Sequence, residues 1–169
     1  MGKALFAGWT FTKLIKAAKD FGDAWRDTVV TFKNFDKVFG EFNSVAINGI
    51  RELKEEFAET EKGARKLLST IGSRIDFNLN TTEISAMSKD LAILSKEIGA
   101  FYGIDASQVS EKLTRGLSGM TKGLKEFGIN IDTTSPRFKA LVEDLMISTG
   151  KTEEAAKAMV IYNEIMKKG

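Results

Sequence analysis

Apolar residues in the first third of the chain return at alternating steps of four and three. The stripe consists of Phe21, Trp25, Thr28, Phe32, Phe35, Phe39, Phe42, Ala46, Gly49 and Leu53. Its mean spacing of about 3.5 residues keeps one face of a helix turned toward a partner over several turns. The pattern therefore predicts a long amphipathic, coiled-coil-like helical arm over residues 1–66.

The composition of this stripe narrows the kind of partner that it suits. Phenylalanine dominates at positions where two-stranded coiled coils prefer leucine, valine and isoleucine, so a broader bundle or a groove fits better than a tight zipper. Two interpretations stay open: the helix packs on its own domain, or it packs against copies of itself or against another protein. The residues predicted to form this seam are Phe21, Trp25, Phe32, Phe35, Phe39 and Phe42. Gly40 and Gly49 are points where the helix can break.

Beyond residue 66 the pattern changes to short amphipathic segments separated by helix-start and helix-stop residues. Asn80 followed by Glu83 resembles a capping box, and Pro136 fits the first position of a helix. Other starts and stops fall at Gly103, Asp105, Gly128, Ser135, Gly150 and Thr152. The sequence thus predicts an all-α fold, with a compact module of about five short helices over residues 67–169.

The composition removes most catalytic chemistry. The chain contains neither histidine nor cysteine, so it lacks Ser–His and Cys–His nucleophile pairs and the usual zinc ligand sets. Its 25 basic and 23 acidic residues nearly cancel, which gives no electrostatic case for sequence-specific nucleic-acid binding. We therefore expect no enzymatic activity, no catalytic residue, no metal site and no cofactor.

The N-terminal residues leave membrane contact open. Polar residues and glycine interrupt them too early for a secretory signal peptide, and no run approaches the roughly 18 apolar residues of a membrane span. Phe6, Trp9, Phe11 and Trp25 nevertheless stand among lysines, as in helices that lie on a membrane surface. A membrane-active helical protein is therefore one of the alternatives.

The segment from Leu113 to Asp132 reads LTRGLSGMTKGLKEFGINID and contains four glycines within a helical pattern. So many glycines suggest tight turns or close backbone approach, since each costs a helix interior about 1 kcal/mol. Together with upstream aromatic residues, this run resembles a segment of the tail tape measure proteins of long-tailed bacteriophages. The residues that carry the resemblance are Phe101, Tyr102, Leu113, Gly116, Leu117, Gly119, Leu124, Gly128 and Ile129. The resemblance covers about residues 71–169 and is strongest over residues 98–132.

One turn departs from the family pattern. Relatives often carry an acidic pair and a proline where this chain has residues 120–123, which read Met-Thr-Lys-Gly. The geometry of that turn is therefore not implied by the resemblance.

The resemblance implies a structural role in a phage or prophage tail. Tape measure proteins are helical rulers, so the implied function is tail length determination and assembly inside the tail tube. The implied partners are copies of the chain, the tail tube and the tail-tip or baseplate proteins. The implied locations are the lumen of the virion tail and, during assembly, the cytoplasm of the bacterial host. Because complete rulers are much longer, we expect a fragment or a short variant. An adaptor or chaperone that binds a partner through the Phe-rich face is the main alternative.

Overall fold

The computed structural model describes the backbone of residues 3–40 and 43–168, with side chains described for Lys16 and from residue 19 onward. Within these ranges the chain is all-helical and has no strand, which confirms the all-α part of the predicted fold class. The helices are α1 (Lys3–Phe39), α2 (Ser44–Phe57), α3 (Glu61–Gly72), α4 (Thr81–Tyr102), α5 (Ala106–Leu117), the 3-10 helix η1 (Thr121–Phe127), α6 (Pro136–Thr149) and α7 (Glu153–Met166).

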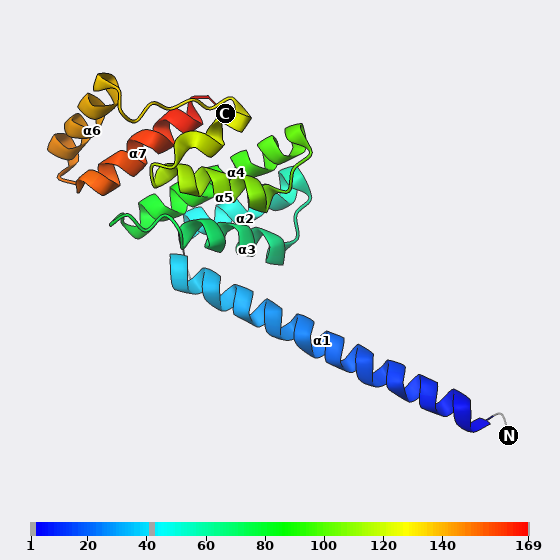
Figure 1. Cartoon of the computed structure of the whole chain (residues 1–169). Helices are drawn as coiled ribbons and strands as arrows, with labels where there is room; N and C mark the ends of the chain where they lie inside the picture. The colour runs from blue at the N-terminus through cyan, green and yellow to red at the C-terminus, as the bar shows by residue number, and fades with distance from the viewer. Residues whose placement is uncertain (1–2, 41–42, 169) are drawn as a thin grey trace.

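Helix α4 is the centre of the bundle. It packs against α2, α3 and α5, while α7 lies on α5 and α6 packs on α7 at the edge (Figure 1). A line of small buried residues runs along α4, consisting of Ser85, Ser88, Ala92, Ser95 and Gly99. The hydroxyls of Ser85 and Ser95 each donate to the carbonyl one turn earlier, at 2.6 Å, so they remain satisfied inside the core. Short side chains on this helix allow its neighbours to pack closely around it.

The ends of the helices follow the local signals in the sequence. Asn80 Oδ1 accepts from the N–H of Glu83 at 2.9 Å, and Glu83 Oε2 accepts from the N–H of Asn80 at 3.0 Å. This confirms the capping box. Gly103, Gly128 and Gly150 each end a helix in the left-handed conformation, with φ between 67° and 74°. Glycine adopts that conformation without the steric penalty of a Cβ, so these three stops are also confirmed.

The arm is shorter than the 66 residues that the stripe predicted. Helix α1 ends at Phe39, before Gly40, whose φ is +79°. The chain then returns as α2 and α3, which pack on α4 within the bundle. Asn43 fixes this return, because its side chain caps α2 by accepting from Ala46 N at 3.0 Å and donates to Ser85 at 2.6 Å. The spacing of the stripe continues across the break at Gly40, because the buried residues Ala46 and Leu53 of α2 keep it.

The glycine-rich run forms a corner in which α5 meets η1. A Cβ on Gly116 would lie 2.7 Å from Leu124 Cδ1, so the absence of a side chain allows α5 and η1 to touch. Gly119, with φ +92°, makes the turn between the two helices. Leu113, Leu117, Leu124, Phe127, Ile129 and Ile131 are buried around this corner. Gly116 therefore provides the close approach, and Gly119 provides the tight turn.

Two ion pairs connect distant segments of the bundle. Lys151 Nζ lies 2.7 Å from Glu83 Oε1, and Lys96 pairs with Glu59. Partial burial acts to raise the pKa of each carboxyl, but hydrogen bonds from the lysine and from a backbone N–H, together with the lysine charge, outweigh burial. The net result is a lowered pKa for both Glu59 and Glu83.

We predict that Gly116→Ala destabilises the protein by about 1–3 kcal/mol, because the new methyl group must displace the buried Leu124 side chain. Gly123→Ala is the matched control, since its Cβ would meet nothing closer than 3.8 Å. It is expected to be neutral or stabilising by about 0.5 kcal/mol. Urea denaturation measures both. Equal effects would contradict the assigned close approach.

The two ion pairs predict a dependence of stability on pH. A carboxyl with a lowered folded pKa stabilises the fold fully above its ordinary value of 4.5, and this contribution is lost as the pH falls through the folded pKa. Lys96→Met/Lys151→Met should therefore flatten the loss of unfolding free energy between about pH 5 and about pH 3. Urea titrations at several pH values measure the slope. An unchanged slope in the double variant would refute the assignment.

Candidate interaction surface

Helix α1 is attached to the bundle through its C-terminal third. Phe35 and Phe39 are buried there, with ring centroids 5.0 Å apart, and α1 packs mainly on α3. Gly72 of α3 provides the space, since a Cβ on it would lie 2.7 Å from both Phe39 Cζ and Val38 Cγ1. This contact seats the end of the arm directly on α3.

Arg65 of α3 covers two aromatic rings of the arm. Its guanidinium carbon lies 4.4 Å from the ring centroid of Phe32 and 4.7 Å from that of Phe35. The guanidinium also donates to Glu61 Oε1 at 3.1 and 3.2 Å. A cation over an aromatic face contributes roughly 0.5–2 kcal/mol, depending on how far it is desolvated. Arg65 therefore links α3 to the arm through its charge as well as through packing.

An ion pair marks the outer limit of this junction. Lys62 of α3 pairs with Asp27 of α1. The hydrogen bond and the positive charge of Lys62 lower the pKa of the Asp27 carboxyl. The junction thus extends along α1 from Asp27 to Phe39.

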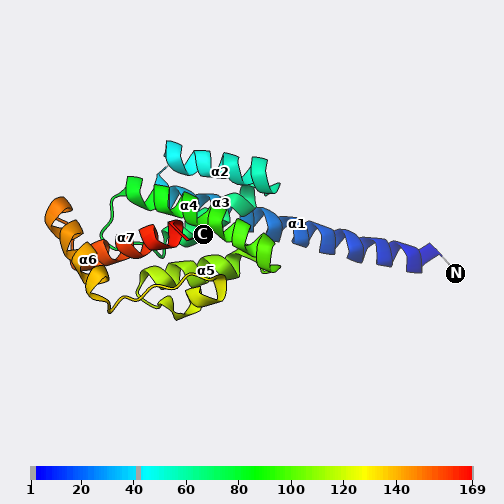
Figure 2. The same ribbon diagram turned by 90° about the horizontal axis from the view of Figure 1, so that it is seen from above.

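Toward the N-terminus from this pair, α1 extends away from the bundle (Figures 1 and 2). This part of α1 carries exposed aromatic residues. Phe21 is 72% exposed and Trp25 is 64% exposed. The half-buried residues Thr28 and Val29 follow them along α1. We call these four residues the arm face. Large apolar side chains gathered on one exposed surface are typical of an interaction site. The arm face is the strongest such candidate among the described residues.

The residues of the predicted seam differ in their burial. Phe21 and Trp25 are exposed, Phe32 is half-buried under Arg65, and Phe35 and Phe39 are buried against α3. Phe42 lies outside the described residues. The interpretation as packing on the chain's own domain therefore holds for the inner part of the seam, and the outer part has no partner within the described structure.

The residues that carry the family resemblance form two groups. Leu113, Gly116, Leu117, Leu124 and Ile129 are buried at the corner of α5 and η1, where Gly119 and Gly128 make turns. Phe101 and Tyr102 instead lie at the exposed end of α4, with Phe101 82% exposed. Their rings meet edge to face at 4.9 Å, and Tyr102 also contacts the buried Phe127 at 5.8 Å. This aromatic pair is a second, smaller exposed apolar feature.

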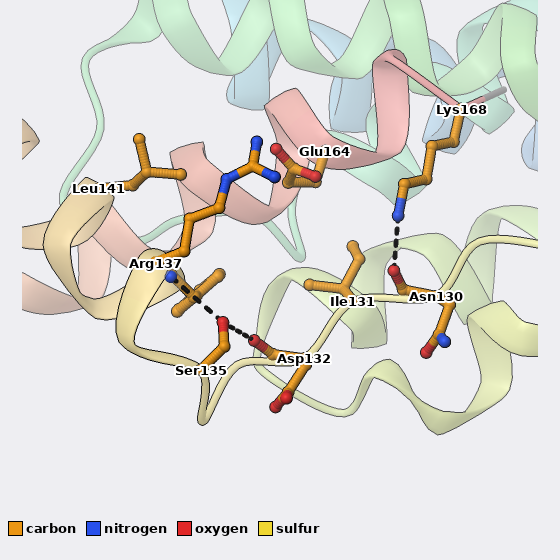
Figure 3. Close-up of a pocket in the computed structure, with 9 residues that line it drawn as sticks. Asn130, Ile131, Asp132, Ser135, Arg137, Leu141, Glu164 and Lys168 are labelled. Carbon is orange, nitrogen blue, oxygen red and sulfur yellow. Dashed lines mark hydrogen bonds between the residues drawn. The ribbon is translucent and has the colours of Figure 1, made fainter.

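A hollow of about 160 Å³ lies between α6, α7 and the segment that follows η1 (Figure 3). Lys168 Nζ donates to the carbonyl of Asn130 at 2.6 Å, and Ser135 Oγ donates to the carbonyl of Asp132 at 2.9 Å. Ser135 Oγ also caps α6 by accepting from the N–H of Phe138 at 3.2 Å. These hydrogen bonds fix the chain's own turns, and both hydrogen bonds of Ser135 Oγ are made to the backbone.

Two further titratable groups, Tyr162 and Asp105, also have structural partners. Tyr162 donates to Asp90 at 2.5 Å, and burial followed by this hydrogen bond raises the pKa of the phenol. Asp105 caps α5 by accepting from Ser107 N at 2.8 Å, and the hydrogen bonds from Ser107 lower its pKa. Within the described ranges, no group of three or more acidic side chains is placed to hold a metal ion.

The sequence analysis did not identify the residues of α3 that hold α1, which are Lys62, Arg65 and Gly72. Glu61 and Arg65 lie four residues apart on α3 and pair at 3.1 Å. Nothing in the local sequence indicated that the same guanidinium covers two phenylalanines of α1. Nor did it indicate that Gly72 makes room for Phe39. These contacts join segments that only the tertiary fold brings together.

Comparisons of the chain with protein-family models, with curated proteins and with solved structures found no match. No helix within residues 3–40 and 43–168 has both the length and the apolar character of a membrane span. The fold and its surface define an all-helical protein whose first helix extends beyond a bundle and leaves an apolar face uncovered.

Phe35→Ala is predicted to lower the free energy of unfolding by about 3 kcal/mol, since it empties the contact between α1 and α3. Phe21→Ala, in the same helix, is the control and should change it by less than about 0.5 kcal/mol. Urea denaturation of dilute protein measures both. Similar losses for the two variants would contradict the division of the seam.

Proposed function

We propose that this chain is a tape-measure-like structural component of a long-tailed phage or prophage tail, which contributes to tail length determination and assembly inside the tail tube. Its location would be the tail lumen and, before assembly, the host cytoplasm. The observation that carries the proposal is the 37-residue helix α1 with its uncovered arm face. At 1.5 Å per residue this helix spans about 55 Å.

Such a helix is suited to assembly because it gains stability from a partner. Isolated helices are marginal in water, and most helical stability in proteins comes from packing an apolar face. Phe21 and Trp25 supply such a face beyond the bundle. We propose copies of the chain as the first partner, followed by the tail tube and the tail-tip or baseplate proteins.

The glycine-rich corner supports the proposal through the resemblance over residues 98–132. Gly119 and Gly128 have a positive φ that favours glycine, and Gly116 lies too close to the Leu124 side chain for a Cβ to fit without a shift. Their spacing therefore reflects the construction of a particular helical corner, and that corner is the part of the chain that resembles the family. We propose no catalytic role for any residue, because the chain contains neither histidine nor cysteine and Ser135 is engaged as a helix cap.

The first test concerns self-association. We expect the full chain to sediment as an oligomer, and Phe21→Glu/Trp25→Glu to sediment as a monomer, because the charged groups cannot be buried without a partner. Ile147→Glu is the matched control: Ile147 is 77% exposed, but it lies on α6, away from the arm. It should remain oligomeric. A wild-type chain that stays monomeric at high concentration would argue against the proposal.

The second test concerns the tail itself. In a lysogen or phage that produces this chain, purified tails should contain it by mass spectrometry, and ejection of DNA should release it. Disruption of its gene should abolish tails or make their lengths irregular. Tails of normal, uniform length without the chain would refute the ruler function.

A helical adaptor is the second candidate function, and the same arm face favours it. An adaptor would be a monomer that binds a different helical protein and loses that binding in Phe21→Glu/Trp25→Glu. A membrane-active helix is a third alternative, which predicts a blue shift of tryptophan fluorescence on anionic vesicles. Oligomerisation without vesicle binding would favour the structural proposal over both.

A further inference from the structure

The apolar stripe of α1 runs into α2 without a shift in phase, although the structure ends one helix and begins another between them. In the sequence the stripe continues at steps of three and four through Phe39, Phe42, Ala46, Gly49 and Leu53. Two helices joined by a turn pack on separate neighbours, so they need not share one phase. A single helix over the same residues would carry the whole stripe on one face. The sequence therefore also suits an arrangement in which α1 and α2 form one helix.

Two residues favour the break between α1 and α2. Gly40 keeps the helical hydrogen bond of its N–H to the carbonyl of Asp36, at 2.8 Å, but its φ of +79° turns the chain out of the helix. Asn43 then caps α2 through Ala46 N and donates to Ser85. Nothing lies within 4 Å of the Cβ position of Gly40, so the left-handed backbone is what favours glycine there. The break therefore depends on the preference of one glycine and on one cap.

Helix α1 is joined to the bundle mainly through α3, whereas α2 packs on both α3 and α4. If α1 and α2 formed one helix while α2 kept its place, α1 would leave the α3 of its own chain. The vacated surface of α3 includes Gly72 and Arg65, which now contact Phe39 and Phe32. The α1 of a second copy carries the same residues, so it fits this surface exactly as the first one does.

We propose that two copies of the chain exchange their first helices. In the exchanged dimer α1 and α2 are one helix, and α1 of each copy packs on α3 of the other, so that Phe39 of one copy lies against Gly72 of the other. The closed form prevails in dilute protein because Gly40 and Asn43 favour the break, and a higher concentration favours exchange. The contact that is exchanged lies outside Phe21 and Trp25, so this inference is independent of association through the arm face.

Substitution of Gly40 tests the exchange. In the variant Phe21→Glu/Trp25→Glu, which opposes association through the arm face, Gly40→Ala should lower the dissociation constant of the dimer about a hundredfold or more. Alanine disfavours the left-handed break and favours helix, and each dimer has two such joints. Gly22→Ala is the matched control, because its Cβ also meets nothing within 4 Å but lies within α1 in both forms. Sedimentation of protein refolded at equal concentrations measures both.

Cross-linking identifies the chain that supplies α3. The sequence has no cysteine, so Asp27→Cys and Lys62→Cys each give a chain with a single thiol. These two residues pair across the contact between α1 and α3. In the Gly40→Ala background, the two chains refolded together, one of them lengthened by a tag, should give a covalent heterodimer with a short bis-maleimide. Ile147→Cys on α6 replaces Lys62→Cys in the control, which should give none.

The outcomes separate this inference from the proposed function. Tightening by Gly40→Ala alone, together with the cross-link, supports exchange even if the wild-type chain fails to associate through its arm face. A Gly40→Ala variant that folds but stays monomeric overturns exchange. Equal tightening by Gly22→Ala, or a dimer without the cross-link, also overturns it and leaves association through the arm face as it stands.

Discussion

The packing of a long helix on a short one determines the form of this protein. Helix α3 has 12 residues and is about 18 Å long, whereas α1 has 37 residues and is about 55 Å long. Helix α3 therefore covers only one end of α1. Within that covered length Phe39 lies on Gly72, and Arg65 covers the neighbouring rings. Between Lys19 and Arg26, beyond that covered length, every described side chain is exposed.

The local features of the bundle could be predicted because they depend on neighbours in the sequence. A capping box needs only Asn80 and Glu83, and a left-handed helix end needs only a glycine such as Gly103 or Gly150. These signals operate within one turn of helix, so periodicity and residue type suffice to find them. The same holds for the all-α class, since the helical period runs through nearly the whole chain.

The features that could not be predicted depend on contacts with residues far away in the sequence. Phe21 and Phe35 occupy the same stripe and share one residue type, yet the first is exposed and the second is buried. Periodicity identifies the face of a helix but not the length of the helix that covers it. Gly40 was named as a point where the helix can break, but the return of the chain there was not predicted, since α2 continues the spacing of α1 across the break. No local pattern indicated that Arg65 covers Phe32 and Phe35.

The rigidity of α1 restricts what can cover the arm face. The C-terminal third of the helix is held on α3 by Phe35 and Phe39, and the helix continues unbroken through Gly22, which is not in the left-handed conformation. Unkinked helices bend only gently, with radii of roughly 60–100 Å. The outer part of α1 therefore cannot fold back onto its own bundle while it remains helical. Burial of Phe21 and Trp25 would therefore need a second molecule, which supports the proposed role of the arm in assembly.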